Sequence, residues 1–598
     1  MRNQLPVKSS HFSFFPMSMW KCAIALLCCA FSIEPLFAQE VDWVSNGGAV
    51  DNSRFQSIDQ ISPSNVSQLK PAWIFHTGTG GPNVHMEVTP LVVNGVMYLT
   101  DGEDDVFALN PTTGKQIWKY TASDVPAIST LPAPPGFINR GVAYGEGMVF
   151  IGRIDAMLVA LNAKTGAVVW KTAVDLPSND AYLSTAPQFI NASNGAGGTV
   201  PEVVVGLSSD AGARCHVDAY NPATGKLLWR FYTVESATFA GESWQHGGGS
   251  VWQTPTFDPT LNMVYFGVAN PTAPYVAADR AGANLYTDSI VALDATSGEL
   301  QWFFQMVHHD LWDYDSAQPT ILFSLNGVPA IEGNTKSGQT FILDRASGES
   351  LFPYQEVAVP PTPANAAFQH PWPTQPVSSI ESLAEQVAEP GSVPAGAVAA
   401  PSEFATPGPT AQVFQPTGGS GYEYPPAAYS PRTHMIYSHA VYSASDMAVA
   451  NVACKLGPTF FGCGQVGGAP PPLGVSHGVY GAINTVTGKV AWSIPVISSI
   501  PNSGMTVGGD LVFFGDGNGL FYAASAATGE VLWVFDALTV PGAGGANAAP
   551  AVYEVGGVEY VVNAFGGSPF WSPLLGDAVI AFALPSSAAA AAHKARVK

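Results

Sequence analysis

The chain has 598 residues, of which 47% are hydrophobic and only 11% are charged, so it can bury a large core, and its composition argues against long disordered regions. Its formal net charge of −22 gives an acidic surface that repels nucleic acid and anionic membranes, and that either favours a basic partner or serves solubility alone. The 61 glycines, 49 prolines and 14 tryptophans are typical of many short strands joined by tight turns and exclude a mainly helical fold.

The first 38 residues have the features of an export signal. Basic residues precede an apolar run from residue 22 to residue 33, and Ala38 offers a small side chain for cleavage. The run is too short to span a bilayer comfortably, although an N-terminal membrane anchor is the alternative interpretation. We therefore expect residues 1–38 to be a signal peptide and the mature protein to be periplasmic, with no stable membrane span.

Three of the six cysteines fall within that segment, which leaves Cys215, Cys454 and Cys463. In an oxidising compartment Cys454 and Cys463 could close a short loop, and Cys215 would then be unpaired. The sequence has no C-x-x-C-H motif, so it predicts no c-type haem of its own. Electrons from any oxidation would have to leave on another protein.

One pattern recurs along the chain: a small residue, an apolar residue, Asn or Asp, three residues, Gly, three residues and an aromatic residue. Each copy is typical of a strand, a tight turn and a second strand, with the aromatic ring filling the space between neighbouring sheets. The copies end at Trp118, Trp170, Trp229, Trp302, Phe352, Trp492 and Trp533.

Seven copies at this spacing predict the four-stranded blades of a β-propeller. The long gap before Trp492 indicates one degenerate blade, for which residues 421–442 are the candidate, so we expect eight blades. Closure of the ring requires the two ends of the chain to meet, because an open ring leaves unpaired strand edges. Residues 69–75 and 577–584 are expected to share the closing blade.

The predicted fold is therefore all-β: an eight-bladed propeller with Trp-ended blade repeats that spans residues 39–584. Residues 360–416 are rich in Pro, Ala, Gly and Ser and are interpreted as an insertion on one face. Residues 585–598 are expected to form a loose C-terminal tail.

The opening stretch VSNGGAVDNSRFQSIDQISPSNVSQLKPAW, together with the Trp-ended repeats, resembles the PQQ-dependent (quinoprotein) alcohol dehydrogenases, and the similarity runs from about residue 42 to residue 584. The resemblance implies a propeller that holds pyrroloquinoline quinone (PQQ) and one metal ion. It also implies oxidation of an alcohol, polyol or sugar hydroxyl by metal-assisted hydride transfer to the quinone, with a c-type cytochrome or similar protein as the electron acceptor.

The segment HHDLWDYDSAQP resembles the family motif that carries the catalytic base, which assigns that role, and a place beside the metal, to Asp313. Asp315 is similar to the second acid of members that use a lanthanide, but calcium and magnesium relatives have such doublets too, so calcium and a lanthanide both stay open. YFGVANP implies Asn270 as a metal ligand. GLSSDAGAR places Asp210 where the family usually has Glu, which shortens the reach by one methylene. Oxygen donors of this kind suit a hard cation.

A flat, tricarboxylated quinone needs an aromatic floor and cationic or hydrogen-bonding groups around its rim. HGGGSVWQTPTFDP resembles the segment whose Trp lies against the ring, which implies Trp252. FINRGVAYG implies Arg140 for a PQQ carboxylate, and NTKSGQTFILDR implies Lys336 near the quinone oxygens. Glu87 and Ser184 occupy positions where members hydrogen-bond the cofactor.

The sequence departs from the family pattern in two places. Pro134 and Pro135 replace the adjacent cysteines that cover the other face of PQQ in many relatives, and Glu423-Tyr424 replaces an Asn-Trp pair, which alters one rim contact. These changes support an alternative from another class: a non-catalytic propeller that serves as a scaffold or binding module of the cell envelope.

Overall fold

The computed structural model describes residues 40–586, except 82–83, 127–136, 211, 387–392, 394–396, 455–462, 466–476, 497–499 and 573. The predicted signal peptide, Pro134 and Pro135, and nearly all of the predicted tail lie outside the described residues. Within the described part, no helix has the length and apolar character needed to cross a bilayer.

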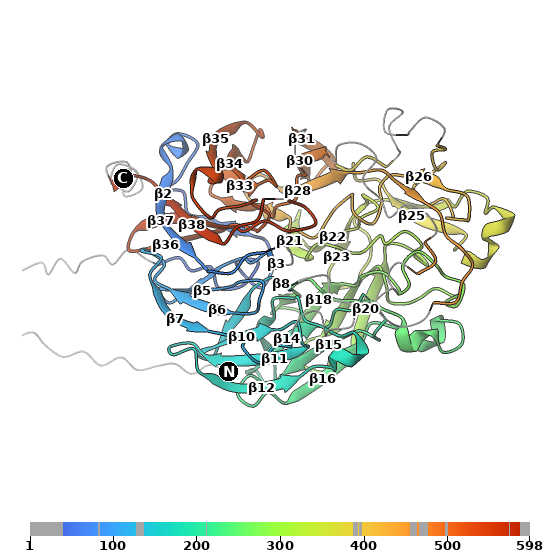
Figure 1. The fold of residues 1–598 in the computed structure, drawn as a ribbon, viewed down its shortest axis with the longest axis horizontal. Coiled ribbons are helices and arrows are strands. Elements are labelled where there is room, and N and C mark those ends of the chain that lie inside the picture. Colours follow the sequence, from blue (N-terminus) through green and yellow to red (C-terminus); the bar gives the residue numbers. More distant parts are fainter. Residues whose placement is uncertain are drawn as a thin grey trace, which may run out of the picture. The chain divides into compact units, whose positions relative to one another are not determined.

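Eight of the sheets in the described chain are propeller blades, which follow one another around a ring (Figure 1). The first four blades are β4 (Leu91–Val93), β5 (Val96–Thr100), β6 (Val106–Leu109) and β7 (Gln116–Tyr120); β9 (Val142–Gly145), β10 (Met148–Gly152), β11 (Met157–Asn162) and β12 (Val168–Ala173); β13 (Gln188–Ser193), β14 (Thr199–Gly206), β15 (His216–Tyr220) and β16 (Leu227–Tyr232); and β17 (Thr256–Asp258), β18 (Met263–Gly267), β19 (Ser289–Asp294) and β20 (Leu300–Gln305).

The other four blades are β21 (Ile321–Leu325), β22 (Val328–Asn334) and β23 (Thr340–Asp344); β27 (Ala428–Ser430), β28 (Met435–Tyr442), β30 (His477–Asn484) and β31 (Lys489–Val496); β32 (Thr506–Gly508), β33 (Leu511–Gly515), β34 (Leu520–Ser525) and β35 (Val531–Asp536), to which β1 (Phe55–Gln56) is added; and β36 (Ala551–Val555), β37 (Val558–Phe565), β38 (Ala578–Ala583) and β2 (Lys70–His76).

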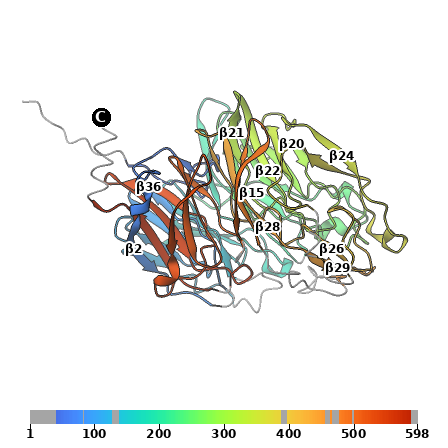
Figure 2. The ribbon, with the colours of Figure 1, turned by 90° about the horizontal axis from the view of Figure 1, so that it is seen from above.

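The two ends of the ring share the last of these blades, as predicted. Strand β2 pairs antiparallel with β38, with Trp73 opposite Ala581. In Figure 2 the blue β2 accordingly lies beside the red strands of the closing blade. The pairing leaves the propeller without an open sheet edge at the junction of its ends. The predicted eight-bladed, all-β fold is thus confirmed.

The prediction that residues 421–442 form a separate degenerate blade is wrong. Strands β27 and β28 from this segment pair with β30 and β31, so they belong to the blade that ends at Trp492. The eighth blade is the closing one, and its aromatic residue is Trp73. The repeat search missed Trp73 because the strand that pairs with it lies more than 500 residues later in the chain.

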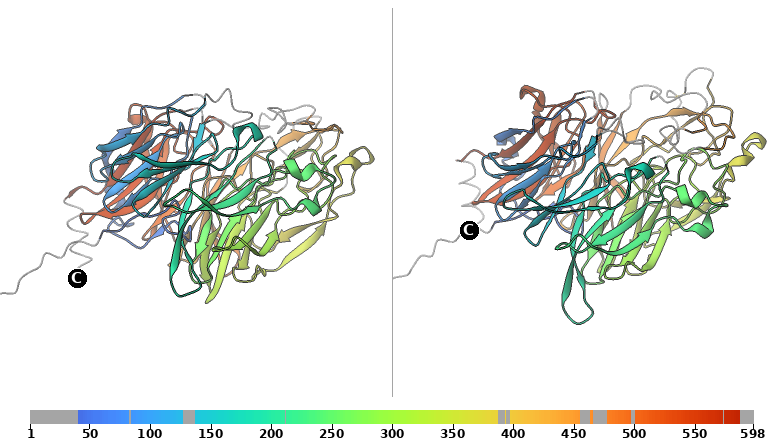
Figure 3. Two further views of the ribbon diagram at one scale, coloured as in Figure 1. Left: turned by 90° about the horizontal axis from the view of Figure 1, so that it is seen from below. Right: turned by 60° about the horizontal axis from the view of Figure 1, so that its bottom comes forward.

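The long gap before Trp492 is occupied instead by small elements outside the blades. These are β24 (Tyr354–Ala358) paired with β25 (Thr374–Ser378), the 3-10 helix η6 (Ala364–Gln369), and β26 (Gln412–Phe414) paired with β29 (Ser445–Met447). Figure 3 shows this yellow-to-orange region at the end of the propeller farthest from the blue and red closing blade. Nearby, Cys454 and Cys463 form a disulfide, and Cys215 is a buried free thiol.

The repeat aromatics lie at equivalent blade positions, as predicted, and each one locks its blade to the next. Trp118 stands opposite Ala108 beside a bulge, and the other repeat tryptophans stand opposite an alanine in the same way. The Trp118 indole donates a 3.0 Å hydrogen bond to the Ala163 carbonyl of the following blade and packs against the turn residue Gly166. Phe352 packs against Gly488 in the corresponding place. The recurring Gly therefore makes room for the preceding blade's aromatic ring.

The opening stretch of the sequence crosses the first strands of several blades. Val50, Asp51 and Ser53 accept backbone hydrogen bonds from three different blades, and β1 adds to a fourth. Arg54 is fully buried, and its guanidinium donates to the carbonyls of Asn46, Met505 and Pro550. This segment therefore links neighbouring blades of the ring through backbone hydrogen bonds.

Candidate functional site

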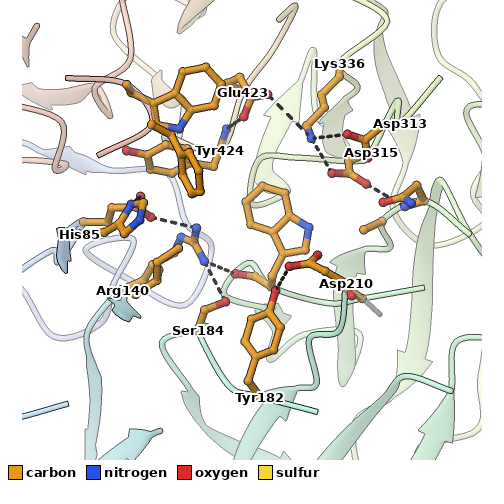
Figure 4. A pocket seen from close by; sticks show the side chains of 18 residues that line it. His85, Arg140, Tyr182, Ser184, Asp210, Asp313, Asp315, Lys336, Glu423 and Tyr424 are labelled. Carbon is orange, nitrogen blue, oxygen red and sulfur yellow. Dashed lines mark hydrogen bonds and ion pairs between the residues drawn. The ribbon is translucent and has the colours of Figure 1, made fainter. Parts of the chain in front are cut away.

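All nine residues assigned to a site by sequence line one cavity of about 170 Å³ (Figure 4). They are Glu87, Arg140, Ser184, Asp210, Trp252, Asn270, Asp313, Asp315 and Lys336. The structure therefore brings together all the residues that the sequence proposed for the site.

Blade topology explains the convergence. Arg140, Ser184 and Trp252 each precede the first strand of a blade, whereas Asp210, Asn270 and Lys336 each follow the second strand. In an antiparallel sheet the start of the first strand and the end of the second lie at the same edge. Loops from four successive blades therefore deliver these six side chains to one face of the ring.

Trp252 lies between the two cations of the cavity. The Arg140 guanidinium carbon is 4.9 Å and the Lys336 ammonium nitrogen 6.0 Å from the centroid of the Trp252 ring. Arg140 donates a 3.0 Å hydrogen bond to the Ser184 hydroxyl and lies 2.9 Å from the Glu87 carboxylate. Its Nε has no hydrogen-bond partner among the described residues. A planar, multiply anionic ligand on Trp252 would meet positive charge at opposite ends.

The Lys336 ammonium is surrounded by three buried carboxylates. Its Nζ lies 2.8 Å from Asp315 Oδ2 and 3.8 Å from both Asp313 Oδ2 and Glu423 Oε1. Burial raises the pKa of the Asp313 carboxyl well above its usual value; the nearby carboxylates add to this rise and Lys336 opposes it. Burial similarly raises the pKa of Glu423 to about 7.

The backbone of Asp313 has an unfavourable conformation that the residues packed around it maintain. Its φ is 68°, in the left-handed region, and its Oδ2 accepts a 3.2 Å hydrogen bond from the Tyr275 hydroxyl. A Cβ on Gly418 would lie 2.3 Å from the same oxygen, so the glycine permits this close approach. Non-glycine residues in this region are often found at functional sites.

The other two candidate metal ligands are engaged within the protein. Asp210 Oδ2 accepts a 2.7 Å hydrogen bond from the Tyr182 hydroxyl, and burial raises the pKa of Asp210 to about 6. The Asn270 backbone N–H donates a 2.7 Å hydrogen bond to Asp315 Oδ1. These contacts fix both residues in place at the cavity wall.

The acids that the sequence proposes as metal ligands do not form a cation site by themselves. Across the residues that the structure describes, no three His, Cys, Asp or Glu side chains form a group that could hold a metal ion by themselves. The physical reason lies in their contacts, because the Lys336 ammonium lies among Asp313, Asp315 and Glu423 while Tyr182 holds Asp210. A metal bound here would therefore need further oxygen ligands, from water or from a cofactor.

The residues nevertheless fit both groups that the resemblance implies. Two cations and five carboxylates line the cavity, namely Arg140 and Lys336 with Glu87, Asp210, Asp313, Asp315 and Glu423. This excess of buried negative charge suits a multivalent cation, to which Asp210, Asp313 and Asp315 would supply oxygen ligands. The aromatic floor and the unpaired Arg140 Nε suit a flat polyanion.

Sequence reasoning missed several residues that line the cavity. Tyr182 and His85 stand beside assigned residues, but nothing in the sequence distinguishes them from ordinary strand or turn residues. Phe570 and Trp571 come from the β37–β38 connection, and Phe570 is 65% exposed. An exposed large aromatic at a cavity wall can contact a ligand, yet exposure is invisible in the sequence.

Comparisons with known proteins agree with this geometry. The family model described as the β-propeller domain of glucose, ethanol and alcohol dehydrogenases matches residues 43–448, and the model of outer membrane protein assembly factor BamB matches residues 476–574. Quinoprotein alcohol dehydrogenase PedH of Pseudomonas putida is 30% identical over 574 residues, which cover 90% of this chain and 88% of PedH. Lanthanide-dependent methanol dehydrogenase of Methylorubrum extorquens is 28% identical, over 81% of both chains.

Solved structures give the same result for the fold. Quinohemoprotein alcohol dehydrogenase ADHIIG of Pseudomonas putida superposes with a TM-score of 0.72 at 27% identity, covering 91% of this chain and 80% of its own. A europium-containing methanol dehydrogenase superposes with a TM-score of 0.71 at 24% identity, covering 91% of this chain and 98% of its own.

Proposed function

This chain belongs to the β-propeller family of PQQ-dependent alcohol dehydrogenases, and from that premise we propose that it oxidises an alcohol, polyol or sugar hydroxyl with PQQ and one metal ion, calcium or a lanthanide. The observation that carries the proposal is the cavity itself: Trp252 lies between Arg140 and Lys336, with Asp313 and Asp315 beside the lysine. A site whose nine assigned residues come from five blades has no evident use in a scaffold.

The binding residues divide into a cofactor group and a metal group. Arg140, with Ser184 and Glu87 around its guanidinium, would hold a carboxylate of PQQ above Trp252. Asp210, Asn270, Asp313 and Asp315 would supply oxygen ligands to the metal. When bound, PQQ supplies a two-electron acceptor and the metal supplies Lewis acidity.

The chain's own chemistry centres on one carboxylate. Asp313 accepts the proton of the substrate hydroxyl as hydride leaves the carbon that bears it, so the carbon is oxidised to a carbonyl. The Lys336 ammonium, 3.8 Å from Asp313, stabilises negative charge that develops near it. The buried walls around both groups exclude bulk water.

The proposal extends to the protein's surroundings. A separate c-type cytochrome or similar acceptor takes up the electrons, in line with the absence of a haem motif from the sequence. Export to the periplasm through residues 1–38 accords with the disulfide between Cys454 and Cys463.

Reconstitution tests the proposal. Purified apoprotein is incubated with PQQ and either Ca²⁺ or La³⁺, and a dye-linked assay then follows oxidation of a panel of alcohols, polyols and sugars. We expect activity that depends on both PQQ and metal and that a chelator abolishes. Tight PQQ binding without turnover of any substrate would favour the alternative of a binding module, and no PQQ binding at all would favour a scaffold.

A further inference from the structure

Glu423 presents to the cavity a carboxylate oxygen that has no hydrogen-bond partner among the described residues. The residue is 3% exposed and precedes β27, and its Oε2 accepts a 3.2 Å hydrogen bond from the Tyr424 backbone N–H. Its Oε1 has no hydrogen-bond partner in the described part of the chain and lies 3.8 Å from Lys336 Nζ, beyond hydrogen-bond distance. A buried carboxylate oxygen without a partner is costly unless another state of the site uses it.

Lys336 is the group that could use it. Its ammonium is 2.8 Å from Asp315 Oδ2, so it occupies a carboxylate that the metal would need. A multivalent cation on Asp315 would repel the ammonium strongly at such short range in a buried site. The lysine is 7% exposed and cannot simply move into bulk water while its backbone stays bonded to the Asp315 carbonyl.

Two other carboxylates, those of Asp313 and Glu423, each lie 3.8 Å from the ammonium. They differ in whether a bound metal would leave them free to pair with Lys336. Asp313 belongs to the set that would face the metal and the substrate. Glu423 does not, and it reaches Lys336 from a different segment of the cavity wall (Figure 4). Of the carboxylates around Lys336, Glu423 is therefore the one left to receive the ammonium.

We propose that Glu423 is the alternative ion-pair partner of Lys336, so that metal binding moves the lysine from Asp315 to Glu423. The inference rests on the proposed function for the identity of the bound groups. Glu423 then acts as a positioning residue: it keeps the lysine charged and inside the cavity after the metal has taken Asp315. Lys336 serves as an internal counter-ion when no metal is bound.

A double-mutant cycle on apoprotein tests this without any turnover. Tb³⁺ affinity is measured by tryptophan-sensitised luminescence, and Ca²⁺ affinity by competition, for wild type, Glu423→Gln, Lys336→Met and the double variant. We expect Glu423→Gln to weaken Tb³⁺ binding at least about tenfold when Lys336 is present and less than about threefold in the Lys336→Met background. Glu332→Gln removes another buried carboxyl, one that does not line the cavity, and should leave the affinity unchanged.

Three results would overturn the inference. Equal losses in both backgrounds would mean that Glu423 acts on the metal directly, and no loss with Lys336 present would mean that it does not act at all. A wild type that binds neither ion would also refute it. If Tb³⁺ binds as expected but the protein with PQQ and metal oxidises no alcohol, the proposed function fails and the ion-pair exchange stands.

A crystal structure of the metal-loaded wild type provides a measurement that needs no variant to fold. We expect the Lys336 Nζ to Glu423 Oε1 distance to fall below about 3.2 Å and the distance to Asp315 to exceed about 4 Å. An ammonium that stays bonded to Asp315 beside the bound metal would exclude the exchange.

Discussion

The Asn46 side-chain amide donates a 2.9 Å hydrogen bond to the backbone carbonyl of Arg140, although the two residues lie 94 positions apart. Asn46 also offers its own carbonyl to the buried guanidinium of Arg54. The opening stretch of the sequence thus supports the cationic end of the cavity from beneath, which gives a structural reason for its likeness to the opening of other family members.

We expect Asn46→Ala to lower the free energy of unfolding by about 1–2 kcal/mol, because the Arg140 carbonyl keeps only a longer, 3.4 Å hydrogen bond from the Thr89 backbone N–H, and to weaken PQQ binding by loosening Arg140. Denaturant unfolding and quenching of tryptophan fluorescence by PQQ measure the two effects. Asn65→Ala removes a similar 2.9 Å amide bond, to Gln60, remote from the cavity. Asn65→Ala should therefore lower the free energy of unfolding and leave PQQ affinity unchanged. If Asn46→Ala also left PQQ affinity unchanged, Asn46 would not support PQQ binding through Arg140.

A comparison of Gly166 with Gly147 distinguishes two costs of adding a side chain: a clash with the neighbouring blade and the strain of the left-handed backbone. Both have a φ of +71°, but a Cβ on Gly166 would lie 2.6 Å from the Trp118 ring, whereas a Cβ on Gly147 would meet nothing within 4 Å. Gly147→Ala should cost only the strain of the left-handed conformation, about 1 kcal/mol, and Gly166→Ala a further ~1–3 kcal/mol for the clash with Trp118. Denaturation midpoints measure the difference. Similar losses of stability in Gly166→Ala and Gly147→Ala would show that the Trp118 ring moves aside at no cost.

The repeat made the fold predictable because each of its residues has a physical task, either in the turn of a blade or at the contact between two blades. Gly166 admits the ring of Trp118 from the preceding blade, and the recurrence of the motif marks seven of the eight blades. Residues 421–442 were misassigned because their partner strands follow a long excursion, and pairing across such a distance leaves no local signal. Trp73 was overlooked for the same reason.

The candidate site was predictable where a motif carried it and not elsewhere. Asp313 and Lys336 lie in distinctive segments, and the structure places both at one cavity. Sequence could not show that the Lys336 ammonium lies closer to Asp315 than to Asp313, nor that Tyr182 holds Asp210, because these contacts depend on side chains from different blades. Glu423 was noticed only as a departure from the family pattern.

Glu332 makes the stability depend on pH. Burial raises its pKa to about 8 in the fold, although the Asn334 amide opposes the shift, whereas the unfolded chain titrates near 4.5. The stabilisation from the protonated form is complete below pH 4.5 and is lost as the pH rises to about 8, by about 1.4 kcal/mol per unit at most. Glutamine keeps the bond to Asn334 and cannot ionise.

Glu332→Gln should therefore match wild type near pH 4.5 and exceed its unfolding free energy by ~2–4 kcal/mol near pH 8. Denaturant unfolding across this range measures the difference. The exposed Glu299 provides the matched control, because Glu299→Gln should follow wild type at every pH. A difference in unfolding free energy between Glu332→Gln and wild type that did not change with pH would show that Glu332 ionises alike in the folded and unfolded protein.

Asp315 is expected to favour a trivalent metal. Its carboxylate contributes one negative charge, and the Coulomb energy that it supplies grows with the charge of the ion. Asp315→Ala should raise the La³⁺ concentration needed for half-maximal activation more than the Ca²⁺ concentration, by roughly tenfold or more. Activation titrations of the PQQ-loaded variant measure both. Asp315→Glu keeps the charge and should restore part of the preference, whereas equal losses with both ions would remove the lanthanide interpretation.

Asp313→Asn tests the base assignment with little disturbance of the fold. Asparagine tolerates the left-handed φ of 68° at this position, and its carbonyl oxygen can still accept the Tyr275 hydroxyl. The amide cannot take up the substrate proton, so we expect kcat to fall by about 10²–10⁴-fold while PQQ affinity stays within a few fold of wild type. Dye-linked kinetics and fluorescence titration with PQQ measure the two quantities on the same preparation.

Asp313→Ala should lose turnover to the same extent, but its methyl group cannot reproduce the contact with Tyr275. A weaker affinity for PQQ in that variant alone would therefore identify a structural loss. Turnover of Asp313→Asn near the wild-type rate would show that another group accepts the proton.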